Sequence, residues 1–472
     1  MSNIHQLYAQ KLTTAEGIAA QIRPGWVMSS DIGLGMPYAL LNTIGEYLYE
    51  HRVEGVAAHI QPGWVMSSDI GLGMPYALLN TIGEYLYQHK VEGVVIHTIL
   101  DLRPLNCYEP HIAPYFRATT CFSGAWARKA VNAGLADVVP CYYRDMPRYF
   151  RERERLDAII LTAAPMDDEG YFSIGINGSN TPALLENCER IYLQVGSKVP
   201  RALHAPKIHI SQVTAFCTTD DPLPSPGMVE LDDMSRVIGG YIAEEVPDES
   251  TIQLGIGAIP EAVGLALHAK RDLGIHTELL TDSMIELIRC GAVTNDAKPL
   301  HRGRTVATLS YGSQDMYAYI HENDAIEFLP VDYTNDPAII AQHPKFMSVN
   351  GALAVDFYGQ VCAESLGTKH VSGTGGQADY VRGAVASPGG KSFIAFPSTA
   401  AGGTVSRIAA TLPVGSVVTT SKNDVDCIVT EYGIARLRGK TLWQRTKELI
   451  AVAHPDFRDQ LLHDARKMNI IV

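Results

Sequence analysis

Three segments in the C-terminal half of the sequence combine glycines with side chains that acyl or phosphate chemistry uses. The first, Leu254–Pro260 (L-G-I-G-A-I-P), follows a predicted strand and precedes a predicted helix. Its two glycines let backbone N–H groups approach a ligand, and the helix N-terminus favours an anion. Pro260 stands where a dinucleotide fingerprint needs glycine or alanine, which disfavours a Rossmann NAD site. Phosphate contact and a tight structural turn remain the two interpretations of this loop.

Glu278 is the second candidate, because it lies inside the apolar, strand-like segment Gly274–Asp282 (G-I-H-T-E-L-L-T-D). A charged side chain is rarely buried in such a segment without a partner. A carboxylate at this position can attack an activated carbonyl or act as a general base. The alternative that the segment leaves open is a buried ion pair, or a cap for the helix predicted to start near Asp282.

The third candidate is Val371–Gly383, in which three glycines occur within four residues. Such glycines supply backbone amides without obstruction by side chains, as an oxyanion hole or a ligand cradle requires. Gln377, Asp379 and Arg382 follow directly. A structural loop seldom carries three such polar residues behind its glycines, so the segment indicates function.

Composition limits the class of protein. The 472 residues carry 38 Lys and Arg against 51 Asp and Glu, a net charge of −13, and 46% of them are apolar. Disordered and fibrous proteins are excluded, and a broad nucleic-acid surface is disfavoured. The start of the chain lacks the pattern of a signal peptide and no apolar run approaches 18 residues, so we expect a cytoplasmic protein without a membrane span. The eight scattered cysteines are expected to be reduced thiols rather than disulfides or a metal site.

A near-identical duplication occupies the N-terminal region. Residues 16–53 recur as residues 54–91, with 33 of 38 positions identical and no third copy. Each copy predicts a strand, a glycine turn and a helix, and two copies are too few for a solenoid. We expect the second copy, which continues into Val94–Leu100, to take the core position and the first to be displaced or looped out.

Short Val/Ile-rich runs alternate with amphipathic helical stretches along the rest of the chain, which predicts α/β architecture with mostly parallel sheets. The Pro-rich stretch Asp221–Gly227 is the linker candidate, and it divides the chain into domains 1–225 and 226–472. Strands are predicted, among other places, at Ala158–Ala163, Thr251–Leu254, Glu278–Leu280, Phe328–Val331 and Val417–Thr419.

Six phrases of the second half, taken together, resemble the acetyl-CoA hydrolase/transferase family, and within it the 4-hydroxybutyrate and butyrate CoA-transferases. They occur in family order and spacing, and the resemblance covers nearly the whole chain apart from one repeat copy. The phrases are Gly255–Pro260, Gly274–Glu278, Gly373–Gly383, Phe396–Ala400, Thr419–Asp426 and Val429–Gly433. The resemblance implies two CoA-transferase-like (NagB/RpiA-like) α/β domains, usually assembled as oligomers.

The resemblance also implies a role for individual residues. Glu278 matches the catalytic glutamate, the nucleophile that carries a glutamyl-CoA thioester, and Asn350 and Gly375 match groups that stabilise the oxyanion. The positions expected to contact CoA are Gly255, Ile256, Gly257, Ala258, Ile259, Leu353, Gly373 and Gly376. Apart from the resemblance, Lys391 and Arg407 are candidates for the CoA phosphates, and a plain surface charge is the alternative for each.

The sequence therefore predicts a CoA-transferase that moves CoA from a short-chain acyl-CoA to a carboxylate such as acetate, with CoA as substrate and no permanently bound cofactor or metal. Its expected partners are acyl-CoA, small carboxylates and further copies of itself, without nucleic acid or membrane. Two alternatives remain open: a hydrolase on the same scaffold, and a CoA-binding protein inactivated by the duplication. Glu364 is a second, less favoured nucleophile candidate, and His454 is expected to be structural.

Overall fold

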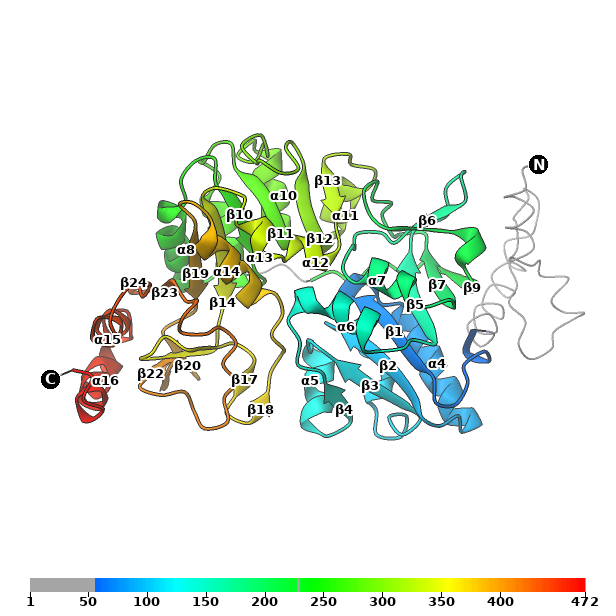
Figure 1. Cartoon of the computed structure of the whole chain (residues 1–472), viewed down its shortest axis with the longest axis horizontal. Helices are drawn as coiled ribbons and strands as arrows, with labels where there is room; N and C mark the ends of the chain where they lie inside the picture. The colour runs from blue at the N-terminus through cyan, green and yellow to red at the C-terminus, as the bar shows by residue number, and fades with distance from the viewer. Residues whose placement is uncertain (1–55, 227–229, 472) are drawn as a thin grey trace, which may run out of the picture. The chain divides into compact units, whose positions relative to one another are not determined.

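The computed structural model describes residues 56–226 and 230–471. The chain divides into two compact units (Figure 1). Among the described residues, unit 1 contains 56–139, 147–224 and 317–323, and unit 2 contains 140–146, 225–226, 230–316 and 324–471. Each unit is an α/β fold around one large sheet, as the sequence predicts.

Unit 1 is built on a seven-stranded sheet in the order β4-β3-β2-β1-β5-β7-β9, in which every pairing is parallel. Its inner strands are almost wholly buried and apolar, which is typical of parallel sheets covered on both faces. The strands are β1 (Val65–Ile70), β2 (Val94–Ile99), β3 (Phe116–Thr120), β4 (Ala136–Val138), β5 (Ala158–Ala163), β7 (Ile191–Gly196) and β9 (Ala215–Thr219). The helices are α4 (Tyr76–His89), α5 (Ala125–Asn132), α6 (Met146–Glu152) and α7 (Thr181–Glu186), and β6 (Tyr171–Ser173) pairs antiparallel with β8 (Lys207–His209).

The second copy of the duplication forms part of this core. It supplies β1, which pairs in parallel with β2 on one side and β5 on the other, and it supplies the helix α4. The prediction that the second copy takes the core position is therefore confirmed. The prediction for the first copy falls at residues 16–53, outside the described residues.

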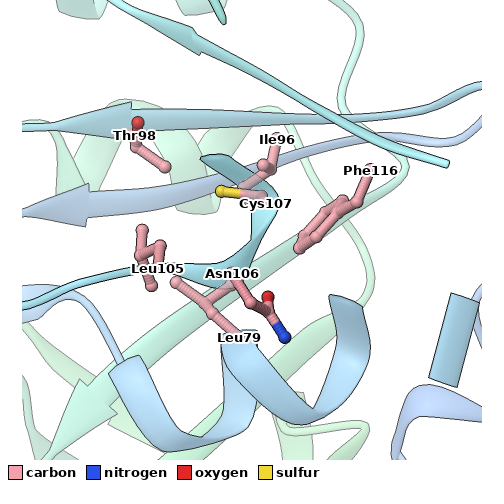
Figure 2. Close-up of a pocket in the computed structure, with 7 residues that line it drawn as sticks. All are labelled: Leu79, Ile96, Thr98, Leu105, Asn106, Cys107 and Phe116. Atoms are coloured by element: carbon pink, nitrogen blue, oxygen red, sulfur yellow. The ribbon is translucent and has the colours of Figure 1, made fainter. Parts of the chain in front are cut away.

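Helix α4 packs tightly on the sheet of unit 1. Figure 2 shows Leu79 of α4 beside Asn106 and Cys107, with Ile96 and Phe116 on the neighbouring strands. The side-chain amide of Asn106 donates to the Asn80 carbonyl at 2.5 Å, and the Asn106 N–H donates to the Asn80 side chain at 2.8 Å. The small pocket between these residues has no room for a water molecule, so this part of the second copy is close-packed core.

Unit 2 is built on an eight-stranded sheet in the order β13-β12-β11-β10-β14-β19-β23-β24 (Figure 1). All pairings are parallel except that of β23 with the edge strand β24. The strands are β10 (Thr251–Leu254), β11 (Gly274–Leu280), β12 (Thr305–Ser310), β13 (Ile326–Phe328), β14 (Phe346–Gly351), β19 (Lys391–Ala395), β23 (Cys427–Thr430) and β24 (Gly433–Arg436).

Helices and small hairpins complete unit 2. The helices are α8 (Asp233–Glu245), α9 (Ala258–Ala266), α10 (Asp282–Arg289), α12 (Val331–Thr334), α13 (Pro337–Ile340), α14 (Gln377–Ala386), α15 (Leu442–Ala451) and α16 (Pro455–Lys467), and the residues of α11 (Gln314–Ile320) divide between the two units. Short strands form three further sheets: β15 (Ala354–Asp356), β16 (Val361–Cys362) and β22 (Ile408–Ala409); β17 (Ser365–Leu366) and β18 (Lys369–His370); β20 (Thr399–Ala400) and β21 (Val405–Ser406).

The strand order of unit 2 places a topological switch point between β10 and β14. The chain runs from β10 outward through β11, β12 and β13, then returns to place β14 on the other side of β10. Ligands of open α/β sheets bind beyond the carboxyl ends of the strands at such a point. The loop after β10 begins with Gly255, and Asn350 lies at the end of β14.

Two predicted strands differ from the structure. β13 ends at Phe328, because Pro330 lacks an N–H for the ladder and caps the helix α12, which begins at Val331. Val417–Thr419 belongs to no strand: it follows the left-handed Gly415, and the Val417 N–H donates to the Ser365 hydroxyl. In the part of the chain that is described, no helix has the length and apolar character needed to cross a membrane.

Candidate active site

Glu278 lies in β11, among strand residues that are otherwise buried. Its Oε2 accepts a hydrogen bond from the Asn335 side-chain amide at 2.6 Å. Burial raises the pKa of the Glu278 carboxyl to about 7, although the bond from Asn335 lowers it. Oε1 has no hydrogen-bond partner among the residues that the structure describes. The carboxylate is thus a desolvated group with one oxygen held and one oxygen available to react.

Gly376 packs directly against this carboxylate. It is the N-cap of α14, and a Cβ added there would collide with Glu278 Oε2 and with the Asn335 amide nitrogen. The neighbouring Gly375 adopts φ +57°, a left-handed conformation that favours glycine. The family resemblance assigns Glu278 and the glycines of 373–376 to the same reaction. The structure brings Glu278 and Gly376 into contact.

Asn335 was missed by the sequence analysis. It follows the four-residue helix α12, is fully buried, and leaves its Oδ1 without a partner among the described residues. Fifty-seven residues separate it from Glu278 in the sequence. The segment Thr334-Asn335-Asp336-Pro337 signals only a helix boundary, so nothing in a single sequence links Asn335 to the carboxylate.

Asn350 lies in a polar network beside the loop Gly255–Ile259, which we call the first glycine loop. Its Nδ2 donates to Gln253 Oε1 at 3.1 Å and to Ser348 Oγ at 2.9 Å. The Gly255 N–H donates to the Val349 carbonyl at 2.9 Å, and a Cβ added to Gly255 would lie 3.6 Å from Asn350 Oδ1. The structure therefore joins Asn350 to the loop after β10, whereas the amide that contacts Glu278 is that of Asn335.

The loop from Gly255 to Ile259 leads into α9. Gly257, the N-cap, has φ +119°, which only glycine adopts without strain, and α9 starts at Ala258. Ile256 is 58% exposed, an unusual position for a large apolar side chain. The first N–H groups of α9 have no partner within the helix and lie after the carboxyl end of β10, where they can bind an anion.

An ion pair between a partly exposed arginine and a buried aspartate lies next to residues 373–376, which we call the second glycine loop. Asp379 of α14 is fully buried, and the Arg144 guanidinium lies 3.4 Å from its Oδ1. Burial raises the pKa of Asp379 to about 8, Arg144 opposes that shift and the charge of Glu278 adds to it. Arg144 also lies 3.5 Å from Asp336, and the N–H of its neighbour Tyr143 donates to the Gly375 carbonyl at 3.2 Å. The segment 140–146 thus belongs to unit 2 and braces the loop.

For Lys391, Leu353 and Arg407 the structure records contacts with residues other than Glu278. Lys391 is the first residue of β19, at the amino edge of the sheet, and its Nζ lies 2.8 Å from Glu245. The Leu353 N–H donates to the Cys362 carbonyl at 2.8 Å, and Arg407 donates to the Ala352 carbonyl at 3.3 Å. Gly373 precedes Thr374 in the second glycine loop.

The two alternative residues have structural partners. The Glu364 carboxylate accepts a hydrogen bond from Thr374 at 3.4 Å. The His454 side chain accepts from the Asp456 N–H and caps α16, in agreement with the structural role expected for it. Both Glu278 and Glu364 contact the second glycine loop, but only Glu278 of the two also accepts a hydrogen bond from the buried Asn335 amide.

Comparison with known proteins assigns a family to each half of the chain. The acetyl-CoA hydrolase/transferase N-terminal domain family matches residues 46–227, and the C-terminal domain family of the same name matches residues 312–465. The N-terminal match starts near the end of the first repeat copy, so it contains one copy. Glu278 and the loop after β10 fall between the two matched segments.

Relatives and solved structures agree with the domain matches. The chain is 45% identical over 359 residues, 76% of this chain and 82% of the other, to succinyl-CoA:cyclohexane-1-carboxylate CoA transferase of Geobacter metallireducens. It is 41% identical over 354 residues, 75% and 82% of the two chains, to 4-hydroxybutyrate coenzyme A transferase of Clostridium kluyveri. The crystal structure of RipA from Yersinia pestis superposes with a TM-score of 0.85 at 33% identity, covering 100% of both chains.

The chain belongs to the acetyl-CoA hydrolase/transferase family. Within that family it is a CoA-transferase: the relatives at 41 to 45% identity are named as transferases, whereas the acetyl-CoA hydrolase of Schizosaccharomyces pombe is 25% identical. The family and the enzyme class predicted from the sequence are both confirmed.

Proposed function

We propose that Glu278 is the nucleophile of a ping-pong CoA transfer. The observation that carries the proposal is that only one oxygen of the Glu278 carboxylate is hydrogen-bonded. The Asn335 amide donates to Oε2, while Oε1 has no partner among the described residues. Desolvation raises the pKa of this carboxyl to about 7. A desolvated carboxylate is a stronger nucleophile than a hydrated one, because no ordered water must leave before it attacks.

The first half of the reaction follows from thioester chemistry. Glu278 Oε1 attacks the acyl-CoA carbonyl, the C–S bond breaks, and an acyl-glutamyl anhydride and CoA thiolate form. The thiolate attacks the glutamyl carbonyl of the anhydride. The first carboxylate leaves, and Glu278 remains as a glutamyl-CoA thioester.

The second half reverses these steps with a different acid. The incoming carboxylate attacks the glutamyl thioester and gives a new anhydride and CoA thiolate. The thiolate attacks the acyl carbonyl of that anhydride, which releases the new acyl-CoA and restores the Glu278 carboxylate. The overall free-energy change is therefore only the difference between the free energies of hydrolysis of the two acyl-CoA thioesters.

Each step passes through a tetrahedral oxyanion, for which the site offers donors. The Asn335 amide already contacts a carboxyl oxygen of Glu278, and the backbone of Gly376 lies beside it. The N–H groups at the start of α9 are suited to CoA phosphates or to the pantetheine amide. Removal of one oxyanion donor typically lowers the rate by about 100- to 1,000-fold.

We further propose that the donor is a short-chain acyl-CoA, such as butyryl-, 4-hydroxybutyryl-, propionyl- or acetyl-CoA, and that the acceptor is a small carboxylate such as acetate. The support is the similarity to a 4-hydroxybutyrate coenzyme A transferase. The proposal includes a cytoplasmic homo-oligomer without a permanent cofactor. All eight cysteines are free thiols, which fits a reducing compartment.

Intact mass spectrometry tests the nucleophile. Brief incubation with butyryl-CoA should add one CoA less one water to the protein, and acetate should remove the adduct. Glu278→Ala should form no adduct, and Glu364→Ala, the matched control, should form it as the unmodified protein does. An adduct that survives in Glu278→Ala, or that moves with Glu364, would contradict the assignment.

Acetate also separates transfer from hydrolysis. A transferase passes CoA to acetate, so acetate should suppress the release of free CoA from butyryl-CoA. Free CoA release that is unaffected by acetate would favour the hydrolase. CoA binding without an adduct or exchange would indicate that the duplication has inactivated the site.

A further inference from the structure

The carbonyl of Thr334 lies next to the catalytic amide in the chain and is held from two sides. Thr334 immediately precedes Asn335 and is itself fully buried. The His276 ring nitrogen Nε2 lies 2.8 Å from the Thr334 oxygen, and the Tyr380 hydroxyl donates to the same oxygen at 3.2 Å. One backbone oxygen thus receives two side-chain hydrogen bonds, and neither side chain has a role in the chemistry described above.

His276 belongs to the strand that carries Glu278. The two residues are two positions apart in β11, so their side chains point to the same face of the sheet. His276 is fully buried, a costly position for a polar ring that has no function. Its bond to Thr334 fixes the last turn of α12 on the same face as the nucleophile.

Tyr380 belongs to the helix that carries the second glycine loop. Its N–H donates to the Gly376 carbonyl at 3.0 Å in the first turn of α14, and the residue is 1% exposed. Its ring stacks on Phe346 with the centroids 6.0 Å apart, which fixes the direction of the hydroxyl. The Tyr380 bond therefore couples the glycine loop to α12.

We infer that His276 and Tyr380 are positioning residues that act through the Thr334 carbonyl to hold the Asn335 amide against Glu278. The anchor joins the three elements of the site: β11 with the nucleophile, α12 with the amide, and α14 with the glycines. This inference rests on the proposed function of Glu278. Asn335 touches the reacting carboxylate, whereas His276 and Tyr380 do not.

The anchor requires a proton on His276 Nε2, which the neutral ε tautomer and the imidazolium both carry. A carbonyl only accepts, so Nε2 carries the proton, and Nδ1 has no partner among the described residues. The titratable neighbours of the ring are His343, whose centroid lies 4.9 Å away, Lys298 and His301. Burial, with these neighbours adding to it, lowers the pKa of His276 well below its ordinary value. The anchor itself does not titrate near neutral pH, so it adds no limb of its own to the pH profile of the enzyme.

The test removes each of the two hydrogen bonds to the Thr334 carbonyl in turn. For each variant, kcat/KM is measured against pH, and the pKa of the acid limb of that profile is compared. Tyr380→Phe deletes one hydroxyl, His276→Leu deletes the ring donor, and His276→Gln restores an amide N–H close to the position of Nε2. Thr430→Val is the control, because it deletes an equally buried hydroxyl on β23, which donates to the Val452 carbonyl and accepts from the Tyr432 N–H. The probe is butyryl-CoA with acetate, and the full-length protein is used throughout.

The expected result is a fall in kcat together with a shift in pH dependence. A looser Asn335 amide no longer lowers the pKa of Glu278 fully, so the acid limb should move to higher pH by about half a unit. The rate of adduct formation should fall about threefold to tenfold in Tyr380→Phe and further in His276→Leu, since each loses one buried hydrogen bond. His276→Gln should recover most of the loss, and the KM for butyryl-CoA should stay unchanged.

Each outcome decides between an anchor and ordinary core packing. Variants that lose activity only in proportion to unfolded protein, with the acid limb unmoved as in Thr430→Val, would overturn the inference. So would full activity in the folded double variant Tyr380→Phe/His276→Leu. If the unmodified protein forms no adduct, the proposed function fails first, and the positioning role fails with it.

Discussion

At Gly376, in the second glycine loop, a side chain would displace the nucleophile. A Cβ there would overlap Glu278 Oε2 and the Asn335 amide nitrogen, although Gly376 itself has φ −97°, which any residue adopts. The requirement for glycine is therefore one of close approach and not of backbone conformation. The hydrogen bond between Asn335 and Glu278 has room to form because the N-cap of α14, Gly376, carries no side chain.

Gly376→Ala should slow adduct formation by about 100-fold while the protein stays folded. The methyl group must push the Glu278 carboxylate away from Asn335, and misplacement of a reacting group by an ångström lowers rates by about 100-fold. Gly240→Ala is the control, because a Cβ at this position of α8 meets nothing within 4 Å. The measurement is the single-turnover rate with butyryl-CoA together with the melting temperature. Equal rates in the two variants would contradict the close-approach argument.

Much of the fold follows from the sequence because its local signals are strong. β5 (Ala158–Ala163) and β10 (Thr251–Leu254) coincide with short apolar runs, and α8 begins after the capping residue Asp232. Parallel strands buried on both faces read as continuous apolar segments, so their existence is visible without an alignment. Pro330 illustrates the limit: it ends one element and starts the next, and the apolar run across it conceals the boundary.

The site is only half visible in the sequence because its contacts join distant segments. Glu278 and the glycines of 373–376 carry unusual residue types for their positions, and these were found. Asn335 and Arg144 are ordinary residues in ordinary loops, and their roles come from the fold, which brings α12 to Glu278 and the segment 140–146 to Asp379. Lys391 was predicted from the sequence as a candidate phosphate ligand. It lies at the start of β19, at the amino edge of the sheet, and forms an ion pair with Glu245.

Glu278→Gln should make the protein more stable at alkaline pH and inactive. The folded carboxyl has a pKa of about 7 against 4.5 for the ordinary side chain, so the folded state favours the protonated form. Its stabilising contribution is present below pH 4.5 and is lost as the pH rises through 7. The variant, which can still accept from Asn335, should therefore gain up to about 3 kcal/mol in the free energy of unfolding at pH 8. Urea unfolding at pH 5 and pH 8 measures the difference, which should nearly vanish at pH 5; a gain independent of pH would contradict the raised pKa.

Removal of Arg144 should destabilise unit 2 through Asp379. Without the guanidinium 3.4 Å away, the buried carboxylate has no compensating charge, and its pKa should rise further. Arg144→Gln should cost about 1 to 3 kcal/mol of stability, less than a fully buried pair because Arg144 is partly exposed. The double variant Arg144→Gln/Asp379→Asn should recover most of that loss, since no buried charge remains. Urea unfolding of the unmodified protein, the single variants Arg144→Gln and Asp379→Asn, and the double variant at pH 8 measures the coupling. Purely additive losses would show that the pair does not interact.

Deletion of one repeat copy should leave a folded and active enzyme. The second copy alone supplies β1 and α4, and β1 already pairs with a strand on each side, so the sheet of unit 1 has no vacant position beside it. Removal of residues 16–53 leaves 434 residues with that sheet unchanged. Removal of residues 54–91 instead gives a chain that differs from the first at only five positions, which makes it a matched control. Both shortened proteins should melt at or above the temperature of the full chain and transfer CoA from butyryl-CoA to acetate. Loss of folding in both would mean that the first copy contributes to the core, and transfer by the shortened chains alone would identify the duplication as the cause of inactivity.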